Sequence, residues 1–272
     1  MSREASPFDA QHRSGRSSNP RTRRLGILLA CAIGLVLCSL ALSNVTEEGA
    51  ATRSIGRSLA ILTEVDGFLD AEYEGLRERA SGTTDDVALT DFPVEIFFAP
   101  EEVLATDQAG FRDLLLSRAA QRVYDDGASV FREGHNDQAS FFSTENVLRR
   151  GLELLRPTPH RYFFGLTVAL AIGALLLALG LGQAAGGYGR LVAIGLSVSL
   201  VSISFLALAI GVRFTLRVAA DGADDYLLVE FLQLGQELAW APIRNGLIFS
   251  AGAAMLLAAG SILGRWSDAR NL

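Results

Sequence analysis

The chain has 272 residues, half of them hydrophobic, and a formal net charge of -6. Its mean hydropathy of +0.29 is high for a soluble protein of this length, so the apolar residues are expected in long uncharged runs. The 24 basic residues are all Arg, which, with the high Ala, Gly and Leu content, is typical of a GC-rich bacterial genome.

The charges are divided between two regions of opposite sign. Residues 1–24 carry six Arg against Glu4 and Asp9, and we interpret this segment as a disordered basic tail. Residues 44–160 carry 22 acidic side chains against 11 Arg. An acidic domain of this kind offers little to neutralise phosphates, so nucleic acid is excluded as a partner.

Four runs without an ionisable side chain dominate the rest of the sequence. A helix needs about 20 apolar residues to cross the ~30 Å hydrocarbon core of a bilayer. The runs therefore predict transmembrane helices at 25–43, 163–183, 191–212 and 246–263. The expected fold is a mainly α membrane protein: a four-transmembrane-helix bundle with a mostly helical, acidic extracytoplasmic domain at 44–160, between spans 1 and 2.

Arginine placement predicts the orientation in the cell membrane. Five arginines precede span 1 and should hold the amino terminus in the cytoplasm: Arg13, Arg16, Arg21, Arg23 and Arg24. Four crossings return the carboxyl-terminal tail, 264–272, to the same side. Several arginines border the spans on the expected outer side and agree less well: Arg149, Arg150, Arg156, Arg161, Arg213, Arg217 and Arg244. Cleavage of the first span after Ala41-Leu42-Ser43, as a signal peptide, stays open, with an uncleaved anchor preferred.

Apolar residues recur at spacings of three and four directly after span 1, which predicts that the first helix continues outward. The stripe favours packing inside its own domain over an intermolecular coiled coil, because Gly56, Gly67 and Gly75 weaken a free helix. Its members are Ile55, Leu59, Leu62, Leu69, Tyr73 and Leu76.

Further elements are expected in the acidic domain. Phe92 to Phe98 reads as an extended segment whose partner strand is not evident, and Pro100 begins a short helix. Thr106 is expected to cap a longer helix that ends at Asp125-Asp126-Gly127. Ser143 or Thr144 is expected to cap another helix, which Pro157 and Pro159 stop. The inward face predicted for the longer helix is Phe111, Leu114, Leu115, Ala119 and Val123.

The loop at 213–245 contains an amphipathic helix with Leu227, Phe231, Leu234 and Leu238 on one face. Lying on the membrane and docking onto the acidic domain are both open. Docking is preferred, because the polar face carries Glu230 and Glu237 rather than the basic residues that anionic lipid attracts.

No motif predicts chemistry. The spans lack the ionisable groups of pumps, and their small residues at four-residue spacing favour helix packing. Glu133, His135 and Asp137 could share one side of an extended segment, but we expect no metal site without a second cluster to complete the shell. No catalytic, cofactor-binding or metal residues are predicted, and we expect no enzyme.

The favoured function is a structural or protein-interaction subunit of a bacterial cell envelope, a scaffold or accessory protein acting through its extracytoplasmic domain. The expected partners are the lipid bilayer and a membrane or envelope protein, and the chain could form an oligomer. The alternative is a transporter or channel component in which span 3, with Ser199 and Ser202, lines a path.

Overall fold

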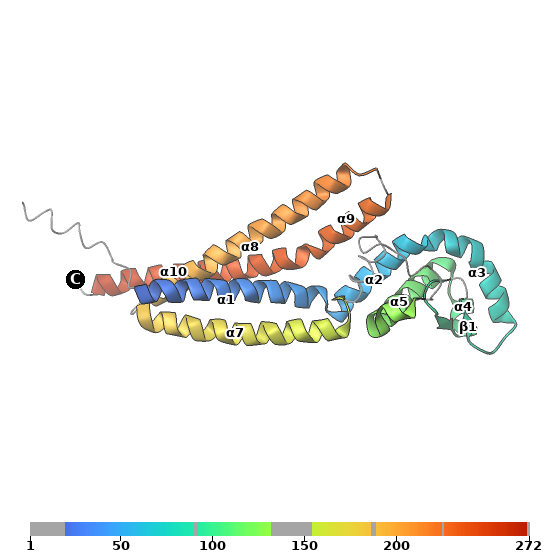
Figure 1. Ribbon diagram of the computed structural model, residues 1–272, viewed down its shortest axis with the longest axis horizontal. Helices are drawn as coiled ribbons and strands as arrows, with labels where there is room; N and C mark the ends of the chain where they lie inside the picture. The colour runs from blue at the N-terminus through green and yellow to red at the C-terminus, as the bar shows by residue number, and fades with distance from the viewer. Residues whose placement is uncertain (1–19, 90–91, 132–153, 186–188, 225, 271–272) are drawn as a thin grey trace, which may run out of the picture. The chain divides into compact units, whose positions relative to one another are not determined.

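The computed structural model describes residues 20–89, 92–131, 154–185, 189–224 and 226–270 (Figure 1). In this part of the chain the fold is mainly helical, and four helical stretches with mean hydropathies of 2.0 to 2.7 are long and apolar enough to cross a membrane. They are Pro20–Val45, Pro157–Ala185, Gly189–Asp221 and Leu228–Trp266. The chain is therefore a mainly helical, multi-pass membrane protein, as its hydropathy predicts.

The chain forms two compact units. The first, called here the bundle unit, comprises residues 1–36, 169–205 and 246–272. The second, called the domain unit, comprises residues 37–168 and 206–245. Each of the four helical stretches long enough to cross a membrane thus contributes to both units.

Glycines let the helices of the bundle unit approach closely. A Cβ added at Gly195 of α8 (Gly189–Asp221) would lie 2.9 Å from Leu257 Cγ of α10 (Trp240–Arg270). One at Gly260 would lie 2.9 Å from Val192 Cγ2. Because real Cβ atoms essentially never lie this close to another heavy atom, α8 and α10 can pack as they do only with glycine at these positions.

The first span also packs through glycines, but its neighbours lie farther from them. In α1 (Pro20–Val45), a Cβ at Gly26 would meet Ser197 Oγ at 3.4 Å, and one at Gly34 would meet Val201 Cγ1 at 3.4 Å. In α7 (Pro157–Ala185), by contrast, Gly165 and Gly173 have nothing within 4 Å. The small-residue stripe predicted on span 1 therefore packs inside the chain, and the one on span 2 does not.

All four spanning helices extend beyond their expected bounds, as α8 and α7 illustrate. Helix α8 continues nine residues past Val212, because no Gly, Pro or Asp interrupts the chain before Asp221-Gly222. Helix α7 begins at Pro157, six residues before the uncharged run. Pro157 and Pro159 lie in its first turn, where a missing N–H costs nothing, so they start α7. The helix expected before them falls largely outside the described residues.

The prediction that the first helix continues outward is wrong. Helix α1 ends at Val45, α2 spans Glu48–Thr63, and α3 spans Val65–Ser81. Thr46 turns its hydroxyl back to Leu42 O (2.8 Å), and Glu47 adopts extended backbone before α2. Glu64, at φ 44°, is left-handed and separates α2 from α3. Neither break contains the Gly or Pro that sequence rules look for.

The domain unit nevertheless buries most of the predicted stripe. Leu62 is the exception, with 41% of its surface exposed. The others join the predicted face of α5 (Gln108–Asp126) in one core, so packing within the domain is confirmed. The core contains Ile55, Leu59, Leu69, Tyr73 and Leu76 with Phe92, Phe98, Phe111, Leu115, Ala119 and Val123.

A short hairpin supplies the strand partner that the sequence does not reveal. Strand β1 (Val87–Ala88) pairs antiparallel with β2 (Phe97–Phe98), in the register Val87 to Phe98. Helix α4 (Pro100–Ala105) follows β2 and ends at Thr106. Thr106 is not the cap of α5: Asp107 occupies that position and accepts the Gly110 N–H at 2.8 Å.

Helix α9 (Tyr226–Leu238) packs against α2 within the domain unit. Arg57 of α2 donates to Glu237, and its Nη2 lies 3.4 Å from Glu230 Oε2 and 3.3 Å from Gln233 Oε1. Docking onto the domain, the preferred expectation for this amphipathic helix, is therefore what the structure shows. Glu230 and Glu237, which the sequence places on the polar face of the helix, make the ionic contacts.

Candidate membrane-proximal site

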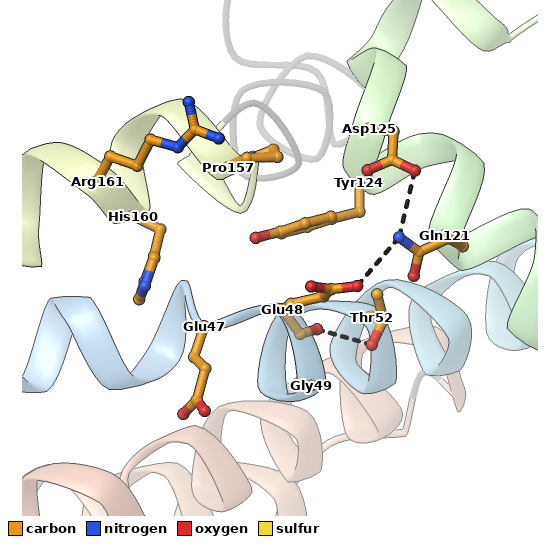
Figure 2. A pocket seen from close by; sticks show the side chains of 10 residues that line it. All are labelled: Glu47, Glu48, Gly49, Thr52, Gln121, Tyr124, Asp125, Pro157, His160 and Arg161. Atoms are coloured by element: carbon orange, nitrogen blue, oxygen red, sulfur yellow. Dashed lines mark hydrogen bonds between the residues drawn. The ribbon is translucent and has the colours of Figure 1, made fainter.

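Three segments distant in sequence line an open cavity of about 740 Å³ in the domain unit. They are the start of α2, the last turns of α5 and the first turn of α7 (Figure 2). Each segment is a helix end, so polar side chains and free backbone groups gather there without disturbing the apolar core. The lining residues are Glu47, Glu48, Gly49, Thr52, Gln121, Tyr124, Asp125, Pro157, His160 and Arg161.

An acidic wall is formed by α2 and α5. The Gln121 amide donates to Glu48 Oε1 at 3.3 Å and to Asp125 Oδ2 at 3.2 Å, so it bridges the two carboxylates. Both carboxylates belong to exposed residues and keep further lone pairs available. In Figure 2 the side chain of Glu47 turns away from this pair.

The ring of Tyr124 extends from α5 across the cavity (Figure 2). The residue is only 4% exposed, and its hydroxyl has no hydrogen-bond partner among the described residues. Burial raises the pKa of Tyr124, the charges of Glu48 and Asp125 raise it further, and Arg161 opposes them. The hydroxyl is therefore a neutral donor and acceptor aimed into the cavity.

The opposite wall comes from α7. His160 Nδ1 lies 3.0 Å from Ser43 O and 3.4 Å from Thr46 Oγ1, and its ring stacks on Phe164 at 6.3 Å. These contacts fix the ring against the end of α1. Arg161 is exposed and forms no ion pair with any residue in the described part of the chain. It is the basic group of this wall.

A second, smaller cavity of about 280 Å³ lies between the start of α2 and the region of α9 and α10. Its lining includes Arg53, Arg244 and Trp240, and the Arg213 guanidinium lies 5.2 Å from the Trp240 ring centroid. Asn44 Nδ2 donates to Asn245 Oδ1 at 3.2 Å nearby. Of the arginines that agree poorly with the charge rule, Arg244 thus lines this cavity.

The residues considered in the sequence for chemistry are placed as follows. Glu133, His135 and Asp137 lie outside the described residues. Within the described ranges, no three His, Cys, Asp or Glu residues are arranged to hold a metal. Ser202 is fully buried in α8, and its hydroxyl donates to Val198 O at 2.8 Å.

Comparison with known proteins adds no family. No protein-family model, curated protein or solved structure matches the chain. The arguments for function therefore come from the chain itself. The cavity is polar and carries charges of both signs, a lining that suits binding.

Proposed function

We propose that the chain is a scaffold or accessory subunit of a bacterial cell envelope, whose helical domain lies outside the cytoplasm and binds a partner protein. The contact that supports this proposal is the docking of α9 on α2 through Arg57. Loops that only connected spans would not need to contact each other. Here the loop after span 3 packs on the domain that precedes span 2, and the two belong to one compact unit, as a binding module requires.

The outward orientation is supported by the charge of residues 1–24. Ser81, an exposed residue at the end of α3, offers a direct test. A Ser81→Cys variant, with Cys31 and Cys38 changed to Ala, should react with a membrane-impermeant maleimide in intact cells. A Ser267→Cys variant should react only after lysis. The reverse pattern would contradict the proposed orientation.

Partner binding is tested by crosslinking in cells, followed by affinity purification from native membranes. The wild type should recover a partner in a fixed ratio. Arg57→Glu should lower that recovery several-fold, because it places like charges between α2 and α9. Arg79→Gln is the matched control, since Arg79 pairs with Glu72 inside α3 at 4.0 Å. Adding Glu237→Arg to Arg57→Glu should restore binding.

Recovery of monomer alone at native abundance, with the domain folded, would overturn the proposal.

The alternative of a path along span 3 stays a prediction. Since Ser202 is buried and its hydroxyl is bonded to its own helix, Ser202→Ala removes the hydroxyl without overfilling the site. A loss of solute flux in that variant, compared with Ser204→Ala on the exposed side of the same helix, would favour the alternative.

A further inference from the structure

The larger cavity lies at the level where two spans leave their apolar runs. Helix α1 ends at Val45, just before Glu47, and Arg161 is two residues before the uncharged run of span 2. Two exposed aromatic residues lie at the start of this uncharged run: Tyr162, 75% exposed, and Phe164, 58% exposed. Aromatic side chains of this kind mark the headgroup level of a bilayer. The cavity therefore opens where lipid headgroups lie.

Charges of both signs face this cavity. Glu48 and Asp125, held side by side by Gln121, form a site for a group that donates several hydrogen bonds. Arg161 provides a site for an anion, as a guanidinium does for phosphate. Tyr124 adds a hydroxyl that points into the cavity and has no partner among the described residues, so it is free to bond to a ligand or to water (Figure 2).

We propose that this cavity binds the headgroup of a membrane lipid that carries a phosphate next to a primary ammonium, as in phosphatidylethanolamine. The ammonium contacts Glu48, Asp125 and the Tyr124 hydroxyl, and the phosphate contacts Arg161. The acyl chains then leave along the exposed apolar face of α7. This inference goes beyond the proposed partner binding and does not depend on it.

The volume is consistent with this ligand. A cavity of about 740 Å³ lies within the range of roughly 300 to 1,000 Å³ typical of small-molecule sites. A phosphate alone would meet two carboxylates, and an ammonium alone would leave Arg161 unpaired. A zwitterionic headgroup satisfies both walls at once, which is why the structure favours it over either single charge.

The test measures binding to the detergent-purified full chain, by native mass spectrometry and by titration. The probes are dioctanoyl phosphatidylethanolamine, dioctanoyl phosphatidylglycerol and soluble phosphoethanolamine. The expected result is that the ethanolamine lipid binds at least tenfold more tightly than the glycerol lipid. Glu48→Gln and Arg161→Gln should each weaken it about tenfold, and Tyr124→Phe about threefold, as loss of charged and neutral hydrogen bonds predicts.

Two control variants separate this site from general effects. Arg244→Gln removes a membrane-proximal arginine that lines only the smaller cavity, and Tyr73→Phe removes a buried hydroxyl that donates to Thr106 O at 2.6 Å. Both should bind the ethanolamine lipid as the wild type does. Glu48 and Arg161 are exposed, so their variants should fold, which thermal unfolding checks.

Equal affinity for the two lipids would overturn the proposal, as would an equal loss in Arg244→Gln. Soluble phosphoethanolamine that binds as tightly as the short-chain lipid would overturn the membrane source of the ligand. Because no partner protein is present in this assay, its outcome is separate from that of the partner-binding experiment.

Discussion

Arg118 donates to both carboxylate oxygens of Glu102, with Nη1 3.1 Å from Oε2 and Nη2 2.7 Å from Oε1. The same Glu102 accepts the Ala99 N–H at 3.0 Å, at the start of α4, and Arg118 also donates to Phe97 O at 2.8 Å. One ion pair therefore ties α5 to the end of the hairpin and to the first turn of α4.

This pair predicts a pH-dependent contribution to stability. The Arg118 hydrogen bond lowers the pKa of Glu102 below its ordinary value of 4.5, and the Ala99 N–H acts in the same direction against burial. A carboxyl with a depressed folded-state pKa stabilises the fold above its unfolded pKa, and this stabilisation is lost as pH falls through the folded value. Glu102→Gln should therefore destabilise the domain at pH 7 and have a shrinking effect below about pH 4.5.

The expected cost of Glu102→Gln at pH 7 is about 1 kcal/mol or less, because a side chain that is 37% exposed is partly screened by water. Thermal unfolding of wild type and variant at pH 7 and pH 3 gives the comparison. Arg122→Gln, which removes an exposed pair with Asp126 at 3.8 Å, is the control. A destabilisation by Glu102→Gln that is equal at both pH values would show that the charge of Glu102 is not its cause.

The start of α5 gives a second prediction. Asp107 accepts the Gly110 N–H at 2.8 Å, so Asp107→Ala removes the side-chain cap and should cost about 1 kcal/mol. Thr106, the residue that sequence rules favour, donates its hydroxyl to Glu102 O at 2.7 Å instead. Thr106→Ala should therefore cost a few tenths of a kcal/mol. Urea unfolding of both variants decides between them, and a larger effect at Thr106 would refute this assignment.

These two neighbours illustrate what the sequence could and could not predict. A cap at the start of α5 was predictable, because Thr and Asp both favour that position. The choice between them depended on the Tyr73 hydroxyl, which binds Thr106 O, and on the turn after α4. Such contacts join residues 33 positions apart and leave no local signal.

The spans could be predicted from the sequence and the site could not, for the same reason. Hydropathy is a local property, so four apolar helices were found from the sequence, whereas the end of α8 was missed because Arg213 and Arg217 end the uncharged run without ending the helix. The cavity was missed altogether. It assembles from helix ends at residues 47–52, 121–125 and 157–161, and no spacing rule connects them. The contact of His160 with Ser43 O, which joins residues 117 positions apart, could not be foreseen either.

Gly127, at the end of α5, gives a third prediction. Its φ of 76° is one that residues with a side chain rarely adopt, and a Cβ there would lie 2.9 Å from Arg156 Nε. Gly127→Ala should therefore cost about 1 to 3 kcal/mol. Gly82→Ala is the matched control, because Gly82 also follows a helix but has φ -98° and ordinary contacts. If calorimetry shows equal melting temperatures for the two variants, the strain at Gly127 is not real.

The last prediction concerns the packing of α8 on α10. Gly195→Ala and Gly260→Ala each place a methyl group 2.9 Å from a side-chain carbon and 3.1 to 3.2 Å from backbone nitrogen of the facing helix. Because backbone cannot yield as a flexible side chain can, the helices must separate, at a cost of about 1 to 3 kcal/mol. Gly252→Ala, on α10 with nothing within 4 Å, is the matched control and should be neutral or slightly stabilising, since Ala favours helix more than Gly does. Thermal denaturation of the detergent-purified chain should rank Gly252→Ala above Gly195→Ala and Gly260→Ala. If Gly252→Ala proved the most damaging, the helix face that packs in this bundle would have to be a different one.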